Sequence, residues 1–169
     1  MIRVPLYVLG VLLAVICSCE RHKGATEPLH NTPVTPTNLK ALISYGTSFG
    51  ECGGYCIREL KIDQLNITFT ASSWFPQDHP DKILQAVIER KEYEQIQSLV
   101  DFDKLAAFDD VIGCPDCADG GAEWLQISVE DQVKKITFEK GATLATIQPL
   151  INKLRQMYAD YNTQMFPVN

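Results

Sequence analysis

The first 19 residues constrain this chain most, because they determine the compartment in which the rest must fold. Arg3 is followed by an almost unbroken apolar stretch over residues 4–16, and the segment ends in Ile16-Cys17-Ser18-Cys19. A charged start, a short apolar stretch and a small residue before the cut are typical of a secretory signal peptide. The apolar stretch is too short for a spanning helix, which needs about 20 such residues. We therefore expect residues 1–18 to be removed and Cys19 to be acylated.

Acylation at Cys19 would attach the protein to a membrane of the cell envelope. Cys17 is the poorer acceptor, because the bulky Ile16 precedes it. Glu20 follows Cys19, so an inner-membrane retention signal of the Asp type is absent and we expect the outer membrane, with the domain facing either the periplasm or the exterior. Residues 19–37 are polar and hold three prolines without an apolar period. They are predicted to be a flexible, lipidated tether.

The charge of the chain argues against a nucleic-acid partner. The 169 residues carry 15 basic and 21 acidic side chains, a net charge of −6. Loss of Arg3 with the leader would leave 14 basic against 21 acidic side chains, a net charge of −7. Nucleic-acid binding needs clustered Lys and Arg, and so does binding to anionic lipid. Contact with the membrane is therefore expected only through the N-terminal acyl chains, and a protein or a glycan remains open as partner.

Residues 38–169 are predicted to form a single α+β domain. Apolar side chains alternate with polar ones at 39–45, 56–62, 65–71, 125–129 and 136–138, which predicts strands. Residues 82–88 fit both a helix and a strand, and we favour a strand. Helices are expected at 91–100, at 102–108 and at the C-terminus, where Pro149 falls in the first turn of an amphipathic helix. The predicted fold is a largely antiparallel sheet of five to six strands with helices on one face.

Four cysteines in this domain form two tight groups, Cys52-Gly-Gly-Tyr-Cys56 and Cys114-Pro-Asp-Cys117. Disulfides suit the oxidising compartment that the leader implies. On the chain-entropy model a local bridge contributes about 2 kcal/mol, against about 4 kcal/mol for a bridge between the groups. Local pairing needs only that each loop bends, whereas crossed pairing needs the two loops to touch. We favour local bridges and expect no cofactor.

Two other chemistries remain open at the cysteines. All four thiolates together would suit zinc, although Cys52 and Cys56 lack the spacing of a zinc ribbon. Redox activity at Cys114 and Cys117 would need a lowered thiol pKa, which the neighbouring Asp116 opposes. The only histidine of the domain, His79, is not placed by the sequence beside a nucleophile. We therefore expect no catalytic residue.

An acidic segment contains the second cysteine group. Residues 101–123 carry seven acidic side chains and one Lys. This segment is either a solvated face or a site for a hard cation. If the two cysteine groups meet at one end of the sheet, the end would present a candidate surface, whose residues are Asp116, Asp119, Glu123 and Trp124. Trp74-Phe75 is an aromatic pair that either packs on the core or is exposed for a partner.

Two stretches carry a resemblance to known sequences: Cys52-Gly-Gly-Tyr-Cys56, and the run from Gly113 to Trp124, GCPDCADGGAEW. Both resemble small lipoproteins of unknown function from Bacteroides-like bacteria. The first also resembles a wider domain of unknown function with a Cys-x-Gly-x-Cys-Pro loop, although Ile57 replaces its proline. Members of that wider group that hold only this cysteine pair have to bridge it locally. The resemblance therefore implies a local Cys52–Cys56 disulfide in this chain. The resemblance implies no activity, so we expect a lipid-anchored envelope module that binds a partner or serves a structural role.

Overall fold

A computed structural model describes residues 40–167 of the chain. The predicted leader (1–18) and the whole of the predicted tether (19–37), with the acylation site Cys19, lie outside these residues. The described part forms one α+β domain with a C-terminal helix, as the alternation pattern predicts. Its strands are β1 (Leu42–Ser48), β2 (Ile57–Asp63), β3 (Asn66–Ser72), β4 (Lys82–Val87), β5 (Val111–Ile112), β6 (Ala122–Val129) and β7 (Gln132–Glu139).

The helices follow or interrupt this series of strands. They are α1 (Arg90–Ser98), α2 (Phe102–Ala106) and α3 (Gln148–Met165), with short 3₁₀ turns η1 (Cys117–Asp119) and η2 (Ala145–Ile147). The ambiguous segment at 82–88 is strand β4, in agreement with the interpretation we favoured. Pro149 lies in the first turn of α3. N–H groups in that turn have no acceptor within the helix, so a proline there costs no hydrogen bond.

The sheet has seven strands in the order β4-β3-β2-β1-β6-β7-β5, so the prediction of five to six strands was too low. The additional strand is β5, whose two residues pair in parallel with Thr137 and Phe138 of β7. All other neighbours are antiparallel, which makes the sheet mixed. Two residues cannot show a period of two, which is why no sequence pattern revealed this strand.

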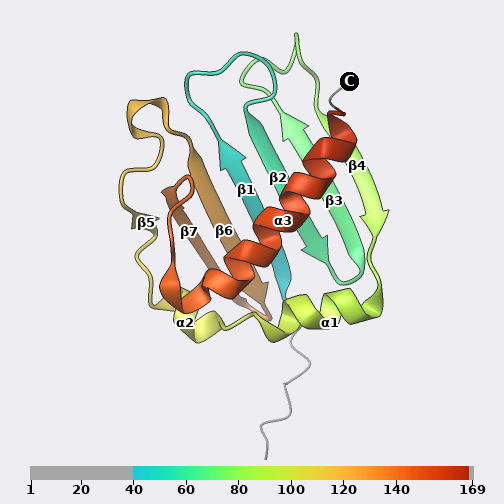
Figure 1. Ribbon diagram of the computed structural model, residues 1–169, viewed down its shortest axis with the longest axis vertical. Coiled ribbons are helices and arrows are strands. Elements are labelled where there is room, and N and C mark those ends of the chain that lie inside the picture. The colour runs from blue at the N-terminus through green and yellow to red at the C-terminus, as the bar shows by residue number, and fades with distance from the viewer. Residues whose placement is uncertain (1–39, 168–169) are drawn as a thin grey trace, which may run out of the picture. The chain divides into compact units, whose positions relative to one another are not determined.

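One face of the sheet carries the core, and α3 crosses it diagonally (Figure 1). The buried face of α3 presents Leu150, Ile151, Leu154 and Met157 to the apolar side chains of the strands. The helices α1 and α2 lie along one end of the sheet rather than on this face, and they contribute Ile96 and Leu105 to the same core.

The opposite face of the sheet, here called the open face, is not covered by any helix of the described residues (Figure 1). It carries mostly polar side chains, as an antiparallel sheet with one solvated face does. Four exposed aliphatic side chains interrupt it near its two edges: Ile83, Val87, Val111 and Val133.

Candidate functional site

Three loops meet at the end of the sheet opposite to α1 and α2 (Figure 1). They are residues 49–56, 73–81 and 113–121, and together we call them the loop end. The backbone N–H of Gly50 donates to Asp116 Oδ2 at 2.9 Å, which joins the two cysteine loops. Trp74 Nε1 donates to the carbonyl oxygen of Phe49 at 2.8 Å, which adds the third loop. The structure therefore brings both cysteine groups to one end, because β1 pairs with both β2 and β6.

Each cysteine group is paired within itself. The Cα atoms of Cys52 and Cys56 are 5.7 Å apart, and those of Cys114 and Cys117 are 5.5 Å apart, each pair joined by a disulfide. The local pairing that we favoured is the arrangement in the structure. Within residues 40–167, no three His, Cys, Asp or Glu side chains are grouped in a way that would hold a metal ion.

The first cysteine loop is held from both sides. Phe49 N–H donates to the carbonyl oxygen of Cys56 at 3.1 Å, which closes the loop over its disulfide. The Tyr55 hydroxyl donates to the carbonyl oxygen of Pro80 at 3.1 Å, and its ring lies 5.5 Å from that of Phe166, just after α3. Cys56 is almost fully buried, as its register with the core residues of β2 predicts.

The second cysteine loop has an unusual backbone. Asp116, Ala118 and Asp119 all have positive φ angles of 52–61°, the left-handed region that side chains with a Cβ rarely adopt. Asp116 is the centre of this loop, because its backbone N–H donates to the Gly121 carbonyl oxygen while Oδ2 accepts from Gly50. Its other carboxylate oxygen, Oδ1, is buried without a hydrogen-bond partner among the described residues. Asp119 is exposed.

Glu123, the third acidic residue of the predicted surface, lies elsewhere. Its side chain is on the core face of β6 and only 4% exposed. Glu123 Oε2 accepts hydrogen bonds of 2.9 Å from the Tyr45 hydroxyl and from Arg155 Nε, and Oε1 accepts one of 3.0 Å from Gly141 N–H. Burial raises the pKa of the Tyr45 hydroxyl, and the charge of Glu123 raises it further. This network ties β1, β6 and α3 together, so Glu123 is a structural residue rather than part of the loop end.

Trp124 is on the open face of β6, on the other side of the strand from Leu125 and Ile127. No helix of the described part of the chain covers it there. Its ring packs directly on Gly46 of the neighbouring strand, where a Cβ atom would overlap it. Lys135 Nζ lies 5.2 Å from the centre of the ring. Trp124 is therefore half-buried by the sheet itself, and it points away from the core face on which Glu123 lies.

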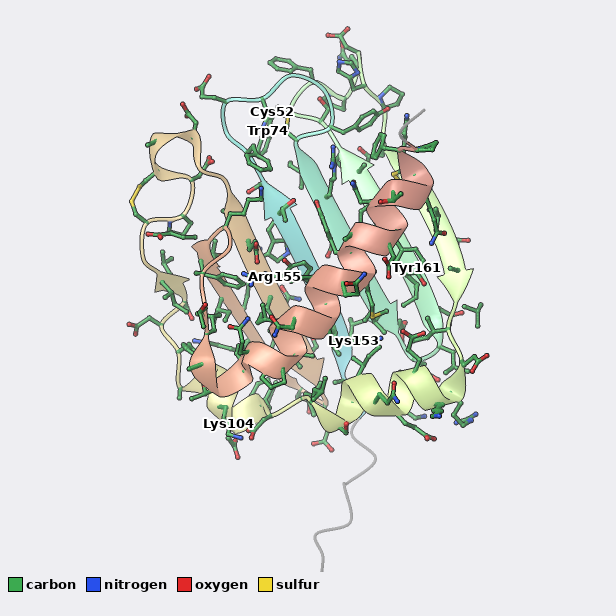
Figure 2. The ribbon with its side chains drawn as sticks, in the orientation of Figure 1. Cys52, Trp74, Lys104, Lys153, Arg155 and Tyr161 are labelled. Carbon is green, nitrogen blue, oxygen red and sulfur yellow. A yellow bond between two sulfur atoms is a disulfide. The ribbon has the colours of Figure 1, made fainter. Side chains whose placement is uncertain are left out.

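The most exposed aromatic side chains of the described residues are Trp74 and Phe75, at 47% and 60% exposure. Their loop is nevertheless well fixed. Ser73 Oγ accepts from Phe75 N–H at 3.0 Å, and the Phe75 carbonyl oxygen accepts from the N–H groups of Asp78 and His79. Trp74 is labelled near Cys52 at the loop end in Figure 2. The sequence left two alternatives for this pair, packing on the core or exposure, and the structure shows exposure.

Two hollows of the described residues lie away from the loop end. A hollow of about 280 Å³ lies along β3 and β4, and one of about 270 Å³ is lined by Lys104, Ala107, Phe108 and Thr146. Neither gathers an acid and a base that would act together. Tyr45 and Arg155, two of the groups whose pKa is raised, are engaged with Glu123.

Comparison with known proteins adds no family. No protein-family model matches the chain, and no curated protein matches it significantly. Among residues 40–167, no helix has the length and apolar character needed to cross a membrane.

Proposed function

We propose that this chain is a lipid-anchored protein of the cell envelope whose domain binds a protein or glycan partner, without catalysis, through the loop end. The observation that carries the proposal is the exposure of Trp74 and Phe75 on a loop hydrogen-bonded to a disulfide-closed neighbour. Exposed aromatic side chains of this size are costly in water and are enriched among the residues that dominate binding energies.

Rigidity of the loop end supports binding over a purely structural role. Two disulfides and the hydrogen bonds Gly50–Asp116 and Trp74–Phe49 restrain all three loops before any partner arrives. A surface ordered in advance loses less conformational entropy on association. A module that only had to keep its strands together would not need to hold two large aromatic side chains in water.

The direction of the chain also favours the loop end as the binding surface. Lys40, the first described residue, precedes β1 at the end of the sheet where α1 lies, whereas the loop end is at the other end of β1 (Figure 1). Seven strand residues span about 23 Å. A lipid anchor upstream of Lys40 would therefore be joined to the domain at the end of β1 opposite to the loop end.

Co-sedimentation with isolated envelope fragments of the producing cells tests the binding role, with every protein, including the one otherwise wild type, carrying Cys19→Ala so that acyl chains do not hold it on the membrane. The variant Trp74→Ser/Phe75→Ser is expected to bind at least about tenfold more weakly than the wild type, because it loses two aromatic anchors. The matched control is Val111→Ser/Val133→Ser, which removes two exposed apolar side chains from the open face at positions outside β4. Both variants should unfold at a similar temperature to the wild type. Equal binding by all three proteins would contradict the proposal.

The alternative, a zinc or thiol-redox protein, makes a different prediction for the four domain cysteines. The oxidised protein should show none of these four as a free thiol and no stoichiometric metal when it is purified without a chelator. Four titratable domain thiols before reduction, or one zinc per chain, would contradict the proposed function and support that alternative.

A further inference from the structure

Within residues 40–167, strand β4 is a free edge of the sheet, and its hydrogen-bonding groups alternate between two directions. Ile88 N–H donates to the carbonyl oxygen of Leu65 at 2.9 Å, in the same register that pairs β4 with β3. Hydrogen-bonded and non-bonded pairs alternate along antiparallel strands. The even-numbered residues of β4 therefore bond to β3, and Ile83, Gln85 and Val87 direct their N–H and carbonyl groups away from the sheet.

This edge lacks the features that usually protect one. β4 contains no proline, and its only charged residue is Lys82 at its start. Ile83 and Val87 are 63% and 72% exposed. The other edge of the sheet is interrupted, because β5 has only two residues and covers only Thr137 and Phe138 of β7, whereas β4 is a continuous edge. Long apolar edge strands without protection pair readily with another strand.

We propose that β4 pairs antiparallel with β4 of a second copy of this chain, across a two-fold axis at Gln85. Only residues whose N–H and carbonyl groups point outward can bond across the new edge, so odd-numbered residues must face odd-numbered ones. Centring the pair at Gln85 uses all three such residues: Ile83 faces Val87 of the second copy, Gln85 faces Gln85, and Val87 faces Ile83. Each facing pair exchanges two hydrogen bonds.

The same register brings the exposed apolar side chains of the two copies into contact. Ile83 and Val87 are on the open face, so each would cover its counterpart on the second copy and remove both from water. A two-fold contact uses the same strand on both copies and closes on itself. Addition of β4 to the other edge of a second copy would instead meet an interrupted edge, where β5 covers only Thr137 and Phe138 of β7. The geometry therefore favours a closed pair over an open-ended chain of copies.

Cysteine cross-linking of the full chain tests the register. In the Gln85→Cys variant, the two new cysteines would face each other with Cα atoms about 5.5 Å apart, within the range of a disulfide. In the controls Ile83→Cys and Val87→Cys the equivalent positions would be about 14 Å apart along the strands. Gln85→Cys should therefore form the mapped dimer at least about tenfold faster than either control. Peptide mapping separates this bridge from any bridge of Cys17 or Cys19.

Equal rates for the three cysteine variants would mean random collision and would overturn the proposal. A second measurement needs no new thiol. Ile83→Lys should shift the monomer–dimer equilibrium in sedimentation to monomer, whereas Thr70→Lys, which is opposite Ile83 on β3 and on the same face, should leave the dimer. A wild type that stays monomeric across the accessible concentration range, or a dimer that survives Ile83→Lys, would also refute it.

Discussion

At the scale of single residues, the interior of this domain is held by a charged group rather than by apolar contacts alone. Glu123 is buried on the core face of β6, with Arg155, Tyr45 and Gly141 as donors. A buried carboxylate is tolerated only when its oxygens are satisfied in this way. The loop end nearby can then be exposed to partners while its base stays fixed.

Tyr45→Phe is expected to lower the free energy of unfolding by about 1–2 kcal/mol at neutral pH, because Glu123 loses a donor. The effect should depend on pH. The pKa of Tyr45 is raised above its ordinary 10.0, so the unfolded chain releases this proton near pH 10 while the folded chain keeps it. The contribution of Tyr45 is therefore present below pH 10 and lost as the pH rises above it.

Urea unfolding of wild type and Tyr45→Phe between pH 7 and pH 11 measures this difference. The gap between the two free energies of unfolding should narrow above about pH 10. Tyr93 and Tyr161, whose pKa values burial also raises, are present in both proteins and cancel in the comparison. A constant gap over the whole range would contradict the role assigned to Tyr45.

Gly46 is predicted to be needed because the ring of Trp124 occupies the place of its Cβ atom. Gly46→Ala should destabilise the domain by about 1–3 kcal/mol through overpacking. The double variant Gly46→Ala/Trp124→Ala should lose less than the sum of the two single variants, since removal of the ring relieves the overlap. Thermal or urea unfolding of the four proteins gives the coupling, and strict additivity would exclude this contact.

At the scale of elements, the disulfides stabilise loops that the strands bring together. Replacing Cys52 and Cys56 by Ser should cost about 2 kcal/mol of unfolding free energy, and so should the Cys114/Cys117 double replacement. Because Gly50 donates to Asp116, loss of either disulfide should also loosen the other loop. Amide hydrogen exchange at Gly50 and Asp116 measures this, and exchange that changes only in the mutated loop would show that the loops are independent.

At the scale of the whole molecule, membrane attachment should depend on one residue. Cys19→Ala is expected to abolish acylation and move the protein from the membrane to the soluble fraction, because the domain has no polybasic patch to hold it on lipid. Cys17→Ala is the matched control and should stay with the membrane. Fractionation and metabolic labelling with a fatty acid read out both variants. The reverse result would assign the anchor to Cys17.

Much of the fold was predictable from the order of residues alone. The alternation at Leu65, Ile67 and Phe69 depends only on which face of a strand is buried, and it correctly located β3. The amphipathic period of α3 and the local pairing of each cysteine group are likewise short-range features. The position of Glu123 could also have been predicted in this way. Glu123 is two residues before Leu125 and four before Ile127, so the alternation of a strand puts it on the core face with them rather than on a surface with Asp116.

Tertiary structure alone decided the features that bear on function. The meeting of the two cysteine loops depends on β1 pairing with both β2 and β6, residues far apart in the chain. The exposure of Trp74, the contact of Trp124 with Gly46 and the free edge of β4 follow from which strands are neighbours. Short stretches of sequence encode burial patterns by their period, but the order of strands in a sheet is a property of the whole domain. That order determines which surfaces of this protein remain open to a partner.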